Sequence, residues 1–344
     1  MLRQGSAWHD VAEQARAILE SGIDPRHFLL VTDDSHSETL VAEGHVDRVV
    51  RVAMQAGLPA MTALQMATIN TAEHFGVARD VGMIAPGRWA DFLLVSDLET
   101  LTIDEVYARG EVVAAAGEVR AARPAFTFPP EVRKTMHLPR AVRAEDFRVP
   151  YAGAGPARVH VIGVIENQAP TRHLTFDVRP VNGEVKPDLD RDIAKIAIVK
   201  RHDGMDGVVV GLVSGFGFTS KCAIASTVAH DSHHMIIVGT DEASMAVAGN
   251  SLARSGGGQV VVKDGKVIGR VELKIAGLMS TEKADVVARK AESILQGFKS
   301  CGCELNNPNM QLSLLALVVI PELRISDKGL VDVTQFKFIP VLEE

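Results

Sequence analysis

Two aspartates stand directly after a short apolar run and directly before a helical stretch. The run at 28–31 has the composition of a strand, and Asp33 and Asp34 follow it after Thr32. Carboxylates in this place are typical of (β/α)₈-barrel enzymes, whose catalytic residues lie at the carboxyl ends of the strands. The same pair also fits a helix N-cap. A complete barrel takes about 250 residues, and about thirty precede the pair, so we expect this chain to hold part of such a barrel.

Composition excludes several classes of protein. The 344 residues are 47% hydrophobic and 23% charged, which is typical of a globular protein with room for two domains. The net charge of −7 and the lack of basic runs between aromatic residues argue against a nucleic-acid partner. No apolar run reaches the roughly 20 residues of a membrane span, and three cysteines are too few for a disulfide framework. We therefore expect a cytoplasmic protein without membrane partners.

The first 120 residues predict a helix, a strand and two more helices, followed by short strands with turns. The helices are expected at 8–19, 44–56 and 60–75, and the strands at 28–31, 90–95 and 106–113. Residues 121–157 are rich in proline and have little periodicity, as expected of a linker.

A second domain is expected from about residue 158. Its pattern predicts strands at 193–199, 207–213, 235–238 and 259–271, the last with a hairpin turn at Asp264 and Gly265, and helices at 242–255 and 283–299. Strands and helices in this mixed order indicate an α+β domain.

Seven short stretches carry a resemblance to amidohydrolase-superfamily enzymes, and most closely to the adenine deaminase family. They lie at 32–36, 43–47, 67–73 and 82–91 in the first part of the chain, and at 230–234, 275–280 and 312–323 in the second. The turn at 86–91 is similar to that of many amidohydrolases. Together with the paired aspartates and the second domain, this turn resembles one branch of the superfamily, the adenine deaminases. The second domain argues against amino-sugar deacetylases and cyclic amidases, which lack a counterpart of it.

The resemblance implies a fold of both α/β and α+β class. Residues 1–80 would form the last strand or strands and the C-terminal helices of a (β/α)₈ metal-dependent hydrolase barrel. Residues 81–120 would form part of a small β-sandwich domain, 121–157 a linker, and 158–344 the α+β C-terminal domain of the family. Most of the barrel would then lie upstream of Met1.

The resemblance also implies a reaction, the hydrolytic deamination of adenine to hypoxanthine and ammonia in purine salvage. Family members hold a pair of divalent metals, Mn²⁺ or alternatively Fe²⁺ or Zn²⁺, which lower the pKa of a bridging water. Asp33 would ligate this metal pair and take the proton of the attacking hydroxide. Asp34 and His36 would orient the substrate or neighbouring groups.

The metal-binding His-x-His motif of the family does not occur within residues 1–32. We therefore expect the chain by itself to be incomplete and inactive, with its other metal ligands upstream of Met1. An unfinished barrel exposes strand edges and apolar faces, which favours a homo-oligomer or association with the missing barrel portion.

A second cluster of metal-ligating side chains, His230, Asp231, His233 and His234, supports a different hypothesis. It could hold an accessory metal, line a substrate entrance, or form a hydrogen-bonded polar seam between domains. Adjacent His233 and His234 would point to opposite faces if the backbone were extended. The alternative function is thus a non-catalytic protein that binds a metal or a small molecule through these histidines. The cysteines at 301 and 303 are spaced too closely for a usual zinc site, and we expect buried, inert thiols.

Overall fold

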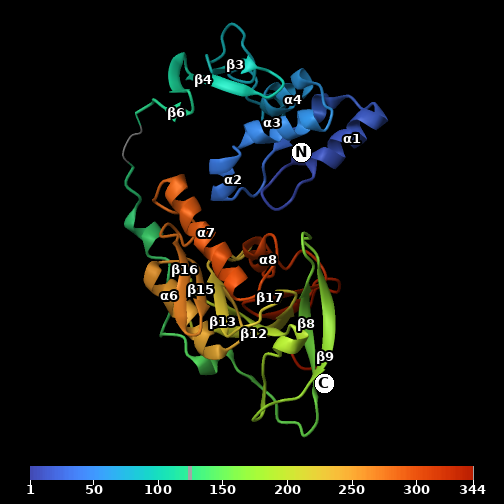
Figure 1. The fold of residues 1–344 in the computed structure, drawn as a ribbon, viewed down its shortest axis with the longest axis vertical. Coiled ribbons are helices and arrows are strands. Elements are labelled where there is room, and N and C mark those ends of the chain that lie inside the picture. Colours follow the sequence, from blue (N-terminus) through green and yellow to red (C-terminus); the bar gives the residue numbers. More distant parts are fainter. Residues whose placement is uncertain (123–125, 344) are drawn as a thin grey trace. The chain divides into compact units, whose positions relative to one another are not determined.

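The computed structural model describes residues 1–122 and 126–343 and divides the chain into two compact units. Unit 1 is Met1–Thr127 and unit 2 is Phe128–Glu344 (Figure 1). The division falls inside the segment 121–157 that the sequence predicts as a linker, and the residues from Phe128 onward belong to unit 2. The fold is of mixed α/β class, and the finer domain boundaries stay predictions.

Unit 1 begins with a strand, a helix and a second strand that lies parallel to the first. Strand β1 (Leu2–Arg3) pairs with β2 (Leu30–Val31), and α1 (Val11–Ser21) connects them. The remaining helices are η1 (Pro25–His27), α2 (Ser37–Ala42), α3 (Val46–Gln55), α4 (Ala60–Ala67) and α5 (Ile69–His74). Parallel strands joined through a helix form a βαβ unit.

The helix predicted at 60–75 is two helices. The backbone at Thr68 leaves helical geometry, at φ −126° and ψ −92°, and the Thr68 hydroxyl donates to the Leu64 carbonyl at 2.6 Å. Threonine side chains compete in this way with the helical hydrogen-bond ladder. Helix α4 places Ala63 and Met66 in the core of the unit, whereas α5 buries Asn70 and Ala72.

A four-stranded antiparallel meander completes unit 1. Its strands are β3 (Phe92–Asp97), β4 (Thr102–Ala108), β5 (Glu111–Ala115) and β6 (Glu118–Val119). The single strand predicted at 106–113 is wrong, because Arg109 and Gly110 both take positive φ and form a two-residue hairpin turn. Val95 and Ile103 pack on the unit's core, which β1, β2, α1, α3 and α4 build.

Unit 2 is built on an eight-stranded sheet with the order β16-β15-β13-β14-β11-β12-β8-β9. All neighbours are antiparallel except β12 and β8, which are parallel. The strands are β8 (Ala157–Val164), β9 (Thr171–Val178), β11 (Ala194–Val199), β12 (Val208–Ser214), β13 (Cys222–Ser226), β14 (Met235–Gly239), β15 (Gly258–Lys263) and β16 (Lys266–Glu272). The mixed α+β character predicted for this part agrees with that topology.

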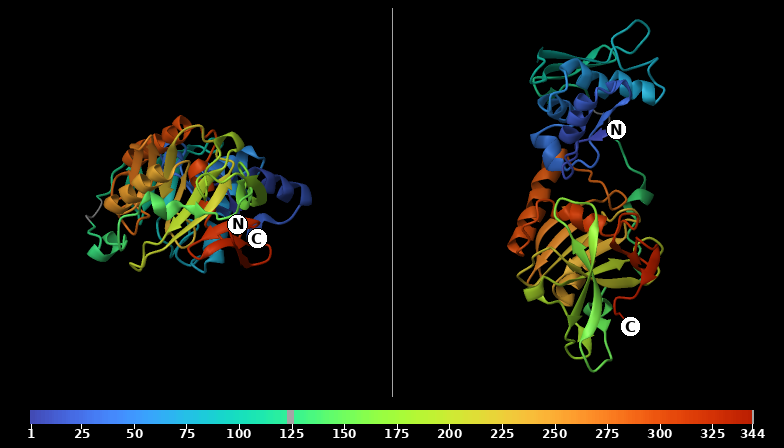
Figure 2. Two further views of the ribbon diagram at one scale, coloured as in Figure 1. Left: turned by 90° about the horizontal axis from the view of Figure 1, so that it is seen from below. Right: turned by 90° about the vertical axis from the view of Figure 1, so that its right-hand side faces the viewer.

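Two long helices cover opposite faces of this sheet. Helix α6 (Glu242–Ser255) packs on Ala225, Ile237 and Val260, whereas α7 (Ala284–Ser300) packs on the side that bears Ile224 and Val261. Figure 1 and Figure 2 show both helices at the β15–β16 end of the sheet, away from the β8–β9 hairpin. Every residue of β11, β13 and β14 is buried, because both faces of these central strands are covered.

Smaller elements surround the sheet. They are η2 (Pro130–Arg133), η3 (Ala144–Phe147), β7 (Val149–Pro150), β10 (Glu184–Val185), η4 (Leu189–Arg191), α8 (Pro308–Leu314), β17 (Leu323–Ser326), β18 (Gly329–Asp332) and β19 (Lys337–Ile339). Among the described residues, no helix combines the length and the hydropathy that crossing a membrane requires.

Candidate active site

Asp33 lies in the loop that follows β2, at the carboxyl end of the parallel strand pair. Its backbone takes the left-handed conformation, at φ 59°, and its side chain is 38% exposed. The Oδ2 atom accepts a hydrogen bond from Arg3 Nη1 at 2.9 Å, and Oδ1 accepts one from the Asp34 amide at 2.9 Å. Both carboxylate oxygens are therefore engaged.

Arg3, on the neighbouring strand β1, holds two carboxylates at once. Its Nε donates to Asp10 Oδ2 at 2.6 Å while Nη1 donates to Asp33. These two hydrogen bonds raise the pKa of the Arg3 guanidinium above its ordinary value. The guanidinium therefore stays charged and fixes the orientation of the Asp33 side chain.

Gly5 and Ser6 fix the backbone of the same loop. A Cβ at Gly5 would lie 2.8 Å from the Asp34 carbonyl oxygen, so the close approach of these two segments requires glycine. The Ser6 amide donates to the Asp34 carbonyl at 2.9 Å, and the Ser6 hydroxyl oxygen accepts from the His36 amide at 2.8 Å. The structure therefore holds Asp34 through its main chain.

His36 is the N-cap residue of α2 and is half-buried. Burial lowers the pKa of its imidazole, against the opposing charges of Glu38 and Asp34. A neutral imidazole in this position can donate from one nitrogen and accept at the other.

Asp33, Asp34 and His36 stay predicted site residues, and sequence reasoning did not single out their neighbours Arg3, Gly5 and Ser6. The one sequence signal for these three residues is the short run at 2–3, which precedes a helix. This run can be recognised as a strand only once it is seen to pair in parallel with the strand before Asp33. Two residues are too few for a periodicity argument.

The side chains around Asp33 do not fit a divalent metal by themselves. Protein metal sites combine several imidazole, thiolate or carboxylate ligands. Within residues 1–122 and 126–343, no group of three or more His, Cys, Asp or Glu side chains is arranged to hold a metal ion. The oxygens of Asp33 already accept hydrogen bonds from Arg3 and Asp34.

The histidines at 230–234 lie in a turn between β13 and β14 and form separate pairs. His233, at φ 52°, accepts at Nδ1 from the Ala229 amide at 3.2 Å, and its ring centroid lies 5.4 Å from that of His230. The ring of His234 instead lies 4.6 Å from that of His202, and its Nε2 is 3.9 Å from Asp327 Oδ2. The accessory metal therefore stays a prediction. Among the described residues, the structure does not bring three ligating side chains together at this turn.

A buried arginine that the sequence did not single out organises this turn. The Arg201 guanidinium donates to the carbonyls of His233 at 2.6 Å, Thr135 at 2.9 Å and Ala276 at 3.0 Å. Burial lowers its pKa to about 10. Arg201 thereby ties three loops of unit 2 together, so the polar seam there lies within one unit.

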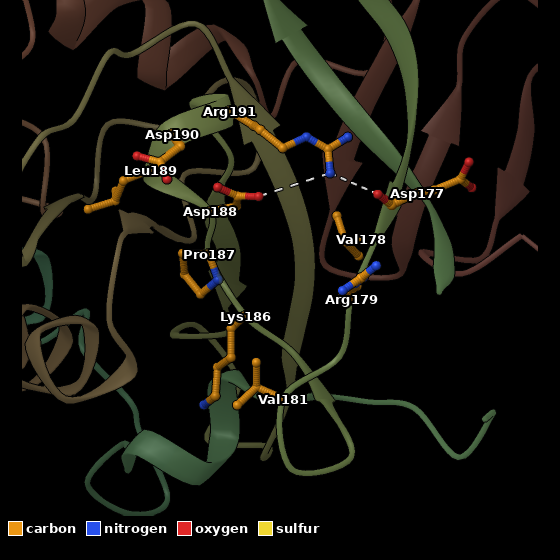
Figure 3. A pocket seen from close by; sticks show the side chains of 10 residues that line it. All are labelled: Asp177, Val178, Arg179, Val181, Lys186, Pro187, Asp188, Leu189, Asp190 and Arg191. Carbon is orange, nitrogen blue, oxygen red and sulfur yellow. Dashed lines mark hydrogen bonds and ion pairs between the residues drawn. The ribbon is translucent and has the colours of Figure 1, made fainter. Parts of the chain in front are cut away.

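None of the predicted site residues lines either of two cavities of the structure. One, in unit 2, has a volume of about 510 Å³. Figure 3 shows both acidic and basic side chains on its wall, and Arg191 Nη1 donates to the Asp177 carbonyl at 2.8 Å. The second, in unit 1, has a volume of about 350 Å³ and lies beside η1 and α5. The mixed charge of the first gives it no electrostatic preference for an anion or a cation.

Comparisons with known proteins connect both units to one family. Residues 168–337 match the family described as the adenine deaminase C-terminal domain, and residues 8–113 match the amidohydrolase family. An adenine deaminase from Mesorhizobium japonicum is 56% identical over 98% of this chain and 56% of its own length. The chain belongs to the adenine deaminase family. A family member from Roseobacter denitrificans is 54% identical over 100% of the chain and 57% of its own length.

This assignment confirms the resemblance found in the sequence and does not favour the alternative of a non-catalytic binding protein. The chain spans between 56% and 58% of the length of the curated relatives it matches. A solved amidohydrolase structure from Thermotoga maritima MSB8 aligns over 33% of this chain and 43% of that chain, with 18% identity and a TM-score of 0.20, a similarity too low to inform the fold.

Proposed function

We propose that this chain takes part in the hydrolytic deamination of adenine to hypoxanthine and ammonia, a reaction of purine salvage. The observation that carries the proposal is the 56% identity to an adenine deaminase over 98% of the chain, which includes the Asp33 loop as well as unit 2. The substrate is then free adenine, a small molecule.

The local fold around Asp33 supports the reading of residues 1–80 as a barrel segment. Strands β1 and β2 are parallel and connected through α1, and the (β/α)₈ barrel repeats this unit. Asp33 lies at the carboxyl end of β2, the side where such barrels carry their active sites. The meander β3–β6 is the proposed part of a small β-sandwich domain.

Asp33 is the proposed general base. In hydrolysis of adenine, water adds at C6 and the amino nitrogen leaves as ammonia, so a proton must move from the water to the leaving group. A carboxylate held in a fixed position can accept that proton and pass it on. Arg3 keeps the carboxylate oriented, and Asp34 and His36 are proposed to orient the substrate or neighbouring groups.

The amidohydrolase family implies a divalent metal, which we propose to be Mn²⁺, Fe²⁺ or Zn²⁺ as a pair in the intact enzyme. The residues described here do not supply a ligand set for it. We therefore propose that this chain alone is inactive and that it works in the cytoplasm, in association with residues that complete the site or with further copies of itself.

A chimera tests the proposal directly. The residues of the Mesorhizobium japonicum relative that this chain does not cover are fused ahead of it, and the metal-loaded protein is assayed for hypoxanthine and ammonia. We expect deamination of adenine by the chimera and none by the chain alone. Asp33→Asn in the chimera should lower kcat by about 100-fold or more, the usual size of a general-base contribution.

Two outcomes would contradict the proposal. A folded chimera that binds metal yet leaves adenine unchanged would exclude the activity. Deamination by the isolated chain with stoichiometric manganese would show that it needs no further ligands.

A further inference from the structure

The turn at 43–47 joins α2 to α3 and orients the first side chains of α3. Gly44 takes φ 110°, a conformation that favours glycine. The Asp47 carboxylate closes the turn, because its Oδ1 accepts from the His45 amide at 2.7 Å. This turn sets where α3 begins, and Arg48 is the third residue of that helix.

The Arg48 side chain connects three elements of unit 1. It is 11% exposed, and its Nη1 donates to the carbonyl oxygens of Gln4 at 3.1 Å and Gly5 at 3.2 Å, the two residues that follow β1. Its Nε donates to Oε2 of Glu43, the residue directly after α2, at 2.5 Å. A guanidinium can make both sets of contacts at once, because its donors lie in a fixed planar fork. Arg48 therefore ties the end of β1 and the end of α2 to α3.

The main chain that Arg48 holds is the one against which the Asp33 loop packs. A Cβ at Gly5 would lie 2.8 Å from the Asp34 carbonyl oxygen, so the two segments are in direct contact. The Ser6 amide donates to the same carbonyl at 2.9 Å. Because Asp34 directly follows Asp33, a shift of Gly5 and Ser6 moves the Asp33 carboxylate as well.

We propose that Arg48 is a positioning residue of the deamination reaction, which fixes the Asp33 carboxylate through the main chain of residues 5–6 without touching the substrate. The inference rests on the proposed function, in which Asp33 is the general base. A general base must lie within hydrogen-bond distance of the proton it takes, and a displacement of about 1 Å can lower a rate by about 100-fold. Loss of the Arg48 guanidinium therefore affects kcat more than KM.

Arg51 provides a matched control on the same helix. Its Nη2 donates to the Glu43 carbonyl at 2.7 Å and to Asp47 Oδ2 at 2.8 Å. Both contacts lie within the segment 43–51. Arg51→Met thus removes a guanidinium from α3 and leaves the contacts of Arg48 with the end of β1 in place.

Hydrogen exchange of the chain and its variants tests the positioning without catalysis. Arg48→Met should raise the exchange rates of the Ser6 and His36 amides by about tenfold or more, since both amides belong to the contact between the two loops. The amides inside α3 should keep their rates, and Arg51→Met should leave the two loop amides unchanged. If Arg48→Met does not fold, Arg48→Lys provides the same comparison with a smaller change.

Kinetics of the chimera test the same residue in the proposed reaction. Arg48→Met should lower kcat by about 10- to 100-fold, while KM changes by less than about threefold. Arg48→Lys keeps a donor for one carbonyl and should recover part of kcat. Arg51→Met should leave kcat within about threefold of the unsubstituted chimera.

The two readouts separate this inference from the proposed function. An inactive chimera would contradict the proposed function, whereas hydrogen exchange would still decide whether Arg48 positions the loop. Unchanged exchange of the Ser6 and His36 amides in both Arg48 variants would overturn the inference. Equal losses of kcat in Arg48→Met and Arg51→Met, or exchange that rises throughout unit 1 in both Arg48 variants, would also overturn it, because the role of Arg48 would then be structural only.

Discussion

The two units of this chain cover their apolar surfaces to very different degrees. In unit 2, the central strands β11, β13 and β14 are buried along their whole length between α6 and α7. In unit 1, large apolar side chains stay in contact with solvent: Ile84 is 85% exposed and Trp89 49%, and Leu93 and Leu94 of β3 are exposed as well. Burial of apolar surface is the main favourable term in folding.

The difference in burial indicates that unit 2 is the structural scaffold and that unit 1 carries the candidate catalytic residue. Unit 2 has a core on each face of its sheet and the features of an independent scaffold. Unit 1 holds the candidate general base on two-residue strands and leaves an apolar surface uncovered, as surfaces that contact another polypeptide do. We therefore expect substitutions to affect stability mainly in unit 2 and activity mainly in unit 1.

The largest effect is expected at Lys195, which has no exposed surface. Its amine donates to Glu184 Oε1 at 2.8 Å, Glu242 Oε1 at 2.7 Å and the Phe147 carbonyl at 2.9 Å. Lys195→Ala removes the buried cation and leaves the two carboxylates with only the more exposed Lys186 and Arg148. It should lower the free energy of unfolding of unit 2 by about 3–5 kcal/mol, measured by urea denaturation. Lys200→Met, on the same chain segment but nearer solvent, is the control and should change it by less than about 1 kcal/mol.

The same cluster predicts a pH dependence. Burial opposes ionisation of Glu184, but hydrogen bonds from Lys195, Lys186 and Arg148 outweigh it and lower the pKa of Glu184 to about 2. A carboxyl group with a lowered pKa stabilises the fold above its ordinary pKa of 4.5 and loses that contribution as the pH falls toward 2. Urea midpoints of unit 2 should therefore fall between pH 4.5 and pH 2, and Glu184→Gln should flatten that decline. An equally steep decline in the variant would exclude Glu184 as its source.

A pair of matched truncations sharpens the comparison between the units. Ile237→Ala removes a fully buried side chain between β14 and α6 and should cost about 2–5 kcal/mol. Leu93→Ala removes an exposed side chain of β3 and should cost less than about 0.5 kcal/mol. Thermal unfolding of each variant measures both. Equal losses would mean that the exposed face of β3 is covered in solution.

A small effect on stability is also expected at Asp33. The Arg3–Asp33 ion pair is partly exposed, and such pairs contribute between about 0 and 1 kcal/mol. Asp33→Asn keeps a residue that tolerates positive φ, so urea denaturation of unit 1 should shift by less than about 1 kcal/mol. In the chimera, the same substitution should abolish most activity. A large loss of stability instead would assign Asp33 a structural role.

Much of the secondary structure could be predicted from local pattern. The helix predicted at 242–255 has the observed bounds of α6, because Asp241 accepts from the Ser244 amide at its start and Gly256 ends it at positive φ. The predicted strand at 235–238 is β14 without its last residue. Continuous apolar runs and end signals identify such elements wherever both faces become buried.

Other elements lacked a usable local signal. Strand β13 has the sequence Cys-Ala-Ile-Ala-Ser, whose small residues are not typical of strands, and it is a strand because β14 and β15 pair with it on both sides. The strands β8 and β9 were not predicted within the second domain, although they form a regular hairpin. Pairing partners decide strand identity in such cases.

For the candidate site, the sequence by itself determined that a carboxylate follows a strand at position 33, and the quoted motifs determined the family. The tertiary structure decided that Arg3 fixes this carboxylate and that Gly5 permits the loop to approach. It also decided that His233 pairs with His230, whereas His234 pairs with His202. The physical reason is the sequence separation over which each kind of interaction acts. Periodicity and end signals act within a few residues, whereas the contacts of Asp33 and His234 join residues about thirty positions apart, which become neighbours only when strands pair.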